Sequence, residues 1–331
     1  MRFLLAAILF LSGCGLRPER LDALFDAASD GLRAGELTKA QLAAEHGIAS
    51  AASRRDLVYQ WKFRLLRCEV LLYSRRAGEV LNQLREDVPP KPEFEALAAR
   101  KMMMEAWAMS TTGRADEGEA LLGAAHRAAE AARAEDVLLD IEPLQGSRLI
   151  LRRRYDEAEV VLRAALARVP AVHSAYSEAG VQVNLGAIRF ERRRYDEAIP
   201  YFERAAALAG PRSRMLYSRA RSNLATCYSQ LGEYDRAIQI HLQSVALDER
   251  FGAKSLLETS LAETGGTYMM KADPRTALPY LERALILARE SKIAGNAAIR
   301  AGNLSSCYGD LRDWQKAASF NQEAIRAKTA A

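Results

Sequence analysis

The sequence predicts an all-α protein, an α-solenoid of about eight helix pairs, and three observations lead to this prediction. Ala, Leu, Arg and Glu dominate the composition, and all four favour helices. Alternating runs of β-branched residues, which would indicate strands, are hard to find. A sequence pattern also recurs about every 40 residues along most of the 331-residue chain.

The first fourteen residues have the layout of an export signal. Arg2 supplies a positive charge, and an apolar run extends from Phe3 to Leu11. The run is too short to span a bilayer, which needs about 20 residues, but it suits a secretory leader. The segment LSGC, which ends at Cys14, resembles the lipobox of bacterial lipoproteins. The alternative is an ordinary leader followed by a chance Cys.

The lipobox resemblance implies how the start of the chain is processed. Residues 1–13 would be a signal peptide, and Cys14 would become the lipidated first residue of the mature protein. Residues 14–20 would then form a short tether, and the acyl chains would hold the protein at a membrane. We therefore expect a lipid-anchored protein of the cell envelope, at the outer membrane or the outer face of the cytoplasmic membrane.

The repeat can be followed through one small residue in each unit. Seven of the eight residues at this position are Ala or Gly: Ala40, Val80, Gly118, Ala158, Ala198, Ala237, Ala277 and Ala317. Three positions earlier, the last five units hold a large or conformationally restricted residue: Tyr155, Tyr195, Tyr234, Pro274 and Trp314. Small residues let two helices approach closely, so each unit should contain a helix A, a short turn and a helix B.

These motifs resemble the tetratricopeptide repeat (TPR). The segment NLATCYSQLGEYDRAI from Asn223 follows the TPR pattern well, and related segments begin at Asn184, Glu263 and Asn303. The resemblance implies units stacked into a right-handed α-solenoid with helix A on the concave face. It divides the chain into divergent TPR-like units at 21–143 and clear TPR units at 144–331. Boundaries between units are expected at residues 87–90, 168–170, 210–211 and 251–252, where Pro or Gly occurs.

The same resemblance implies a peptide-binding set on the concave face. In peptide-binding TPR proteins the Asn that opens the repeated segment faces the groove, and in chaperone-binding members it holds a carboxylate together with basic residues. The matching residues here are Asn184, Arg219, Asn223, Glu263 and Asn303. Gly180 stands where a cation would assist Asn184, and Glu263 would repel an anion, so a carboxylate clamp would be incomplete. The alternative is that these Asn side chains bond to neighbouring backbone.

Other chemistry is poorly represented in the sequence. The four histidines lack metal-ligand spacing, and no Gly-rich phosphate loop or nucleophile motif occurs, so we predict neither an enzyme nor a bound metal or cofactor. The net charge of +5 is small, and Arg is interleaved with Glu and Asp, which argues against nucleic-acid binding. Cys68, Cys227 and Cys307 are expected to be buried, inert thiols.

These features predict a membrane-anchored TPR scaffold that binds a protein or peptide in its groove. A second hypothesis is the sensor portion of a peptidase system, because similar arrays precede caspase-like CHAT domains. A third is a TPR lipoprotein of envelope assembly. The last helix B reaches the end of the sequence without a further covering helix, so we expect either that a partner domain meets that face or that the chain is the front part of a longer protein.

Overall fold

The structure is a computed structural model that describes residues 20–291 and 294–329. Within these residues all regular secondary structure is helical. The elements are α1 (Leu21–Arg33), α2 (Leu37–Ser53), α3 (Leu57–Tyr73), α4 (Ala77–Gln83), the 3-10 helix η1 (Pro92–Phe94), α5 (Glu95–Thr111), α6 (Ala115–Ala131), α7 (Glu135–Leu151), α8 (Tyr155–Val172), α9 (Ala175–Glu191), α10 (Tyr195–Ala209), α11 (Arg214–Gln230), α12 (Tyr234–Phe251), α13 (Lys254–Met270), α14 (Pro274–Glu290), α15 (Ala294–Asp310) and α16 (Trp314–Thr329). The odd-numbered helices are the A helices of the pairs, and the even-numbered helices are the B helices.

The pairs confirm the predicted solenoid of about eight units. Every B helix begins three residues before the small residue of the repeat, as the pattern predicts: at Leu37, Ala77, Ala115, Tyr155, Tyr195, Tyr234, Pro274 and Trp314. In six units the small residue itself is 0% exposed: Ala40, Val80, Ala158, Ala198, Ala237 and Ala277. The divergent first units therefore fold in the same way as the later ones, although α4 is short.

The turn between helix A and helix B has one conformation in all eight pairs. The residue two positions before each B helix has a positive φ, between 58° and 85°: Gly35, Arg75, Gly113, Arg153, Arg193, Gly232, Ala272 and Arg312. The next N–H closes the turn, as where Glu233 donates to the carbonyl of Tyr228 at 2.8 Å. Since Gly adopts this conformation without a Cβ clash, the Arg and Ala residues found here are strained by about 1 kcal/mol each.

The boundary predicted at residues 168–170 is wrong by a few residues. Helix α8 continues through Pro170 to Val172 and ends at His173, whose φ is 53°. A proline in the last turn of a helix removes one hydrogen bond without ending the helix, and the left-handed His173 turns the chain instead. The boundaries at 87–90, 210–211 and 251–252 lie in or beside turns, as expected.

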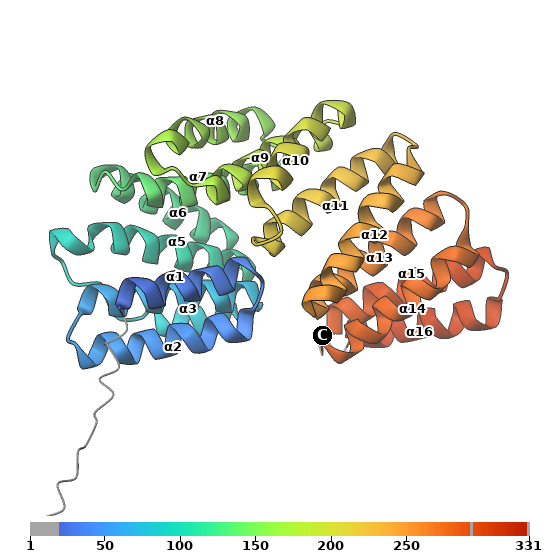
Figure 1. Cartoon of the computed structure of the whole chain (residues 1–331), viewed down its shortest axis with the longest axis horizontal. Helices are drawn as coiled ribbons and strands as arrows, with labels where there is room; N and C mark the ends of the chain where they lie inside the picture. The colour runs from blue at the N-terminus through green and yellow to red at the C-terminus, as the bar shows by residue number, and fades with distance from the viewer. Residues whose placement is uncertain (1–19, 292–293, 330–331) are drawn as a thin grey trace, which may run out of the picture.

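The A helices form the inner layer of a curved array (Figure 1). Each A helix contacts the A helix of the next unit along the whole chain, whereas B helices contact mainly the A helices beside them. An inner layer that packs more closely than the outer layer bends the array with the A helices on the concave side. We call α1–α10 the N-terminal half and α11–α16 the C-terminal half; Figure 1 shows them as two parts of the arc.

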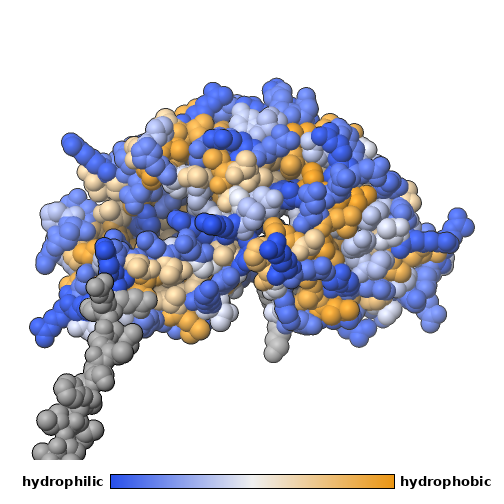
Figure 2. Space-filling view, viewed as in Figure 1, coloured by the Kyte–Doolittle hydropathy of each residue, from blue (hydrophilic) through white to orange (hydrophobic). Residues whose placement is uncertain are grey.

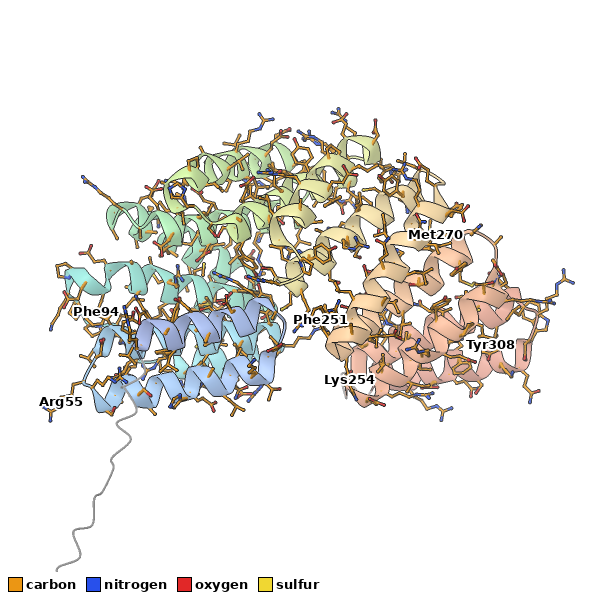
Figure 3. All side chains as sticks on the ribbon, viewed as in Figure 1. Arg55, Phe94, Phe251, Lys254, Met270 and Tyr308 are labelled. Atoms are coloured by element: carbon orange, nitrogen blue, oxygen red, sulfur yellow. The ribbon has the colours of Figure 1, made fainter. Side chains whose placement is uncertain are left out.

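The arc curves far enough for the first and sixth units to touch. Helix α11 contacts α1, and the Arg214 side chain donates to the carbonyl of Ala34 at 2.6 Å and to Glu36 at 3.0 Å. Arg214 also stacks on the ring of Phe251, with its guanidinium carbon 4.5 Å from the ring centroid. Figure 3 shows Phe251 between the two halves. We call these interactions of Arg214 the closing contact, because they close the concave space of the first units.

No helix among the described residues has both the length and the apolar content that crossing a membrane requires. Residues 1–19 lie outside the described residues, and the predicted signal peptide, lipidated Cys14 and most of the tether lie among them.

Candidate functional site

Two adjoining cavities occupy the concave space behind the closing contact. Their volumes are about 310 Å³ and about 440 Å³. They share five lining residues: Glu69, Met104, Asp140, Tyr176 and Ser177. The side chains around them come from the A helices α1, α3, α5, α7, α9 and α11 and from η1. We call the two cavities together the chamber. Its position agrees with the predicted concave binding surface.

Aromatic side chains form one wall of the chamber. Tyr73 and Trp107 meet edge to face, with ring centroids 5.3 Å apart. The hydroxyls of Tyr73 and Tyr176 influence each other, and burial raises the pKa of both tyrosines. Arg33, which lines the larger cavity, stacks on Tyr176, and its guanidinium carbon lies 5.0 Å from the centroid of the ring. Aromatic rings of this kind provide apolar contact area and polar groups at the same surface.

Four charged side chains, from three helices, line the same space. Arg100 on α5 pairs with Asp136 at 3.1 Å and Asp140 at 2.9 Å, both on α7. Glu69 on α3 has no hydrogen-bond or ion-pair partner among the described residues. Burial, and then the charge of Asp140, raises the pKa of Glu69 to about 7. Burial also raises the pKa of Asp140, although Arg100 opposes the shift.

Two of the sequence-predicted residues line the chamber. Asn184 is almost fully buried, and its amide donates to the carbonyl of Pro143 at 2.9 Å. This bond to neighbouring backbone uses one donor of the amide and leaves its other polar atoms for a ligand. Arg219 is exposed at the edge of the smaller cavity. The structure therefore brings Asn184 and Arg219 together at one cavity.

The other three predicted residues lie outside the chamber. Asn223, Glu263 and Asn303 occupy the A helices of the C-terminal half and line neither cavity. Glu263 accepts a hydrogen bond from Ser222, and its carboxyl lies 3.5 Å from the ring of His241. Its carboxyl is thus engaged in packing between α11, α12 and α13.

The chamber residues missed in the sequence belong to the divergent units. The position four residues before the repeated Asn, where Gly180 and Arg219 were recognised, also holds Lys62, Arg100 and Asp140, at spacings of 38 to 40 residues. All five residues line the chamber. Following this register upstream would have found the three missed residues. Glu69, Tyr73 and Trp107 had no comparable signal, because the motif itself is faint before residue 144.

The described residues offer little for other chemistry. Groups of His, Cys, Asp and Glu that would hold a metal ion are absent from this part of the chain. The three described cysteines are buried and unpaired, as predicted. Burial raises the pKa of Cys68 to about 12, of Cys227 to about 12 and of Cys307 to about 11, so these thiols are protonated and unreactive near neutral pH.

The visible surface contains no dominant apolar region. In Figure 2 hydrophilic residues are spread over the whole face, and hydrophobic residues form small groups between them. The chamber is therefore a better-defined candidate site than this outer face.

Comparison with known proteins supports the repeat family and the fold. Residues 177–250 match the family model described as tetratricopeptide repeat. No curated protein matches the chain. Among solved structures, it is similar to a Rap protein complexed with competence and sporulation factor, at 15% identity over 95% of this chain and 98% of that chain, with a TM-score of 0.59. It is also similar to NprR in complex with its cognate peptide NprX, at 15% identity over 82% of this chain and 78% of that chain, with a TM-score of 0.54.

A third similar structure comes from an archaeon. It is the signal transduction ATPase with numerous domains (STAND) from Pyrococcus horikoshii, which has a TPR sensor. The identity is 13% over 94% of this chain, with a TM-score of 0.63, and the chain spans about half of that protein, 48%. At such low identities the likeness shows the fold alone: the chain is a TPR-like α-solenoid.

Proposed function

We propose that this protein is a binding scaffold that captures a short peptide or protein segment in the chamber. The observation that carries the proposal is the concave space of the two cavities, lined by A helices from six successive units and by both aromatic and charged side chains. Pockets with mainly apolar walls and a few converging polar groups are the usual form of a ligand site. Two similar folds, the Rap protein and NprR, have been solved with a bound factor or peptide, which supports the same class of ligand here.

A matched pair of glycine variants tests the proposal. Gly180 lines the chamber, and a Cβ there would meet no atom within 4 Å; the same is true of Gly266 on α13, which lies outside the chamber. Gly180→Phe should fill the smaller cavity, whereas Gly266→Phe should leave both cavities open. The probe is a mixture of synthetic pentapeptides incubated with residues 20–331, with retained peptides separated by size exclusion and identified by mass spectrometry.

The native chain and Gly266→Phe should retain the same peptides, and Gly180→Phe should lose them. Thermal unfolding of both variants checks that they fold. If Gly180→Phe retains the same peptides as the native chain, the ligand binds elsewhere and the proposal is wrong.

We also propose that Cys14 anchors the scaffold to a membrane of the cell envelope. The support is the sequence LSGC after a charged start and an apolar run. Intact-mass analysis of the chain expressed in bacteria should find an acylated protein that begins at Cys14. The variant Cys14→Ala should remain unlipidated. An unprocessed or unlipidated native chain would contradict the anchor and leave the chamber proposal unaffected.

A sensor role is the second candidate function. The similar STAND protein carries its TPR array as a sensor, which favours a regulatory partner, such as a CHAT-type peptidase, that would respond to the bound ligand. Crosslinking with the ligand present and absent distinguishes the two functions: a sensor should gain or lose one enzymatic partner when the chamber is filled. A role in envelope assembly predicts instead that gene deletion changes the profile of outer-membrane proteins.

A further inference from the structure

Glu69 occupies an unusual place in the chamber. Protein surrounds its side chain, but the side chain lines both cavities and so keeps a face toward the open space. The nearby Arg100 and Arg33 favour the charged form of Glu69, but neither forms an ion pair with it, and Arg100 is bonded to Asp136 and Asp140 on α7. Burying a carboxylate without a partner is unfavourable, because water no longer solvates its charge. The side chain is therefore better explained by a missing positive partner than by packing.

The other cations near Glu69 do not pair with it. Arg33 interacts with Asp30 at 3.7 Å and stacks on Tyr176, and the Lys62 ammonium lies over the ring of Tyr59 at 4.7 Å. Arg219 is exposed at the edge of the cavity. Positive and negative side chains are balanced over the whole chamber, so the argument is local. It depends on one unpaired carboxyl beside Asp140.

Aromatic rings adjoin the same point. Tyr73 is one helical turn after Glu69 on α3, and it lines the same cavity as Tyr176. A cation beside carboxylates and ring faces gains from both, since the ring quadrupole attracts positive charge. The same cavity carries Asn184 and the unpaired guanidinium of Arg219 some way along its wall. A ligand with both charges, which every peptide has, matches this distribution.

We propose that the chamber holds a positively charged group of its ligand, an ammonium or a guanidinium, between the carboxyl groups of Glu69 and Asp140 and against the rings of Tyr73 and Tyr176. This inference rests on the proposed capture of a peptide, and it adds the chemistry of the part that is recognised. The cation comes from the amino terminus of the peptide or from a Lys or Arg side chain.

A charge-neutralising variant provides the test. Glu69→Gln keeps the shape of the side chain and removes its charge. Glu191→Gln is the matched control, because Glu191 is exposed at the end of α9 and lines neither cavity. The probe is the pentapeptide mixture, prepared with Lys or with Gln at each varied position, and each version with a free or an acetylated amino terminus. The two modifications distinguish the two sources of the cation.

The native chain and Glu191→Gln should retain cationic peptides in preference to neutral ones by on the order of tenfold, as expected for one charge-assisted hydrogen bond. Glu69→Gln should still retain peptides but lose this preference. Retention of neutral or acidic peptides by the native chain as strongly as cationic ones would overturn the inference and leave peptide capture intact. An unchanged preference in Glu69→Gln would also overturn it. Retention of no peptide by any of the three proteins would overturn peptide capture as well.

The pH dependence provides an independent check. Because the pKa of Glu69 is raised to about 7, its carboxylate form becomes dominant only above neutral pH. The affinity of the native chain for cationic peptides should therefore rise between pH 6 and pH 8, and that of Glu69→Gln should rise less. The charged or titratable groups that line the two cavities with Glu69 are Arg33 on α1, Lys62 and Tyr73 on α3, Glu93 on η1, Arg100 on α5, Asp136 and Asp140 on α7, Tyr176 on α9 and Arg219 on α11. Equal pH dependence in both proteins would contradict the role of Glu69.

Discussion

The chamber and the C-terminal half place their carboxyl groups differently. In the N-terminal half, Glu69 and Asp140 face open cavities. In the C-terminal half, Glu258 is only 2% exposed and lies inside a helix interface, where it accepts from Arg300 at 2.6 Å and from Asn296 at 3.0 Å. These bonds join α13 to α15 and leave no polar atom of the carboxyl facing a cavity.

A second buried carboxyl of the C-terminal half is bonded in the same way. Asp248, also 2% exposed, accepts from Ser260 at 2.7 Å and joins α12 to α13. Burial lowers the pKa of His241 to about 4, so this side chain is neutral at physiological pH. The difference teaches that a buried charged residue alone does not mark a ligand site. It does so where a cavity adjoins the residue and the protein supplies no partner.

Removing Glu258 should have the largest effect on stability, and the effect should be confined to the C-terminal half. Glu258→Ala leaves Arg300 and Asn296 without their acceptor, which should lower the free energy of unfolding by about 3 kcal/mol. Repeat units depend mainly on their neighbours, so hydrogen–deuterium exchange should speed up in α13–α15 but not in α3–α7. The control is Glu290→Ala, whose pair with Lys254 is exposed and should be worth less than about 1 kcal/mol. Equal losses in the two variants would mean that the buried pair contributes little.

Substitutions at two adjacent glycines on α13 test how closely helices A and B approach each other. A Cβ on Gly265 would lie 2.6 Å from the side chain of Leu281, which is 1% exposed and cannot move aside. Gly265→Ala should therefore destabilise the fold by about 2 kcal/mol. Gly266→Ala meets no atom within 4 Å and should stabilise it by about 0.5 kcal/mol, since Ala favours helix.

Gly186 extends the same measurement to the N-terminal half, because it occupies the repeat position of Gly265 and its Cβ would lie 2.8 Å from the ring of Phe202. Gly186→Ala should match Gly265→Ala in chemical denaturation. A neutral effect of either change would show that the helices have room for a methyl group.

Much of the fold was predictable from the sequence, because close helix packing demands particular residues at fixed spacing. The small residue at Ala198 and the ring at Tyr195 fix the start of α10, and the same pair of positions fixes the other B helices. The closing contact was not predictable, since Arg214 and Ala34 are 180 residues apart and meet only through the summed curvature of five units. The chamber depends on that curvature too. Of the candidate site, Asn184 and Arg219 were found, whereas Glu69 lies where the repeat pattern is faint.

Loss of the closing contact should lower the stability moderately, and both halves should be affected. Arg214→Ala removes the bonds to Ala34 and Glu36 and the stacking on Phe251, which should cost about 1.5 kcal/mol. Amide exchange should then speed up in α1 and α11 together, because these helices hold the two ends of the contact. Arg212→Ala is the control, since Arg212 is exposed and has no such bonds. Faster exchange in α11 without any change in α1 would show that the contact does not hold the arc closed.

The smallest expected effect concerns the unpaired carboxyl of the chamber. The pKa of Glu69 rises from 4.5 to about 7 on folding, so the folded state binds the proton more tightly than the unfolded state. The stabilisation that the protonated Glu69 side chain gives to the folded state is fully present below about pH 4.5, and it is lost as the pH rises through 7. Glu69→Gln, which cannot ionise, should match the native chain near pH 5 and exceed it by about 1 kcal/mol at pH 8, a value reduced for the solvent-accessible face of the side chain. Urea unfolding at pH 5 and pH 8 measures this difference, with Glu191→Gln as the control that should follow the native chain at both pH values. A Glu69→Gln variant that is less stable than the native chain at pH 8 would mean that the carboxylate has a favourable partner inside the fold, and the contrast between the chamber and the C-terminal half would then disappear.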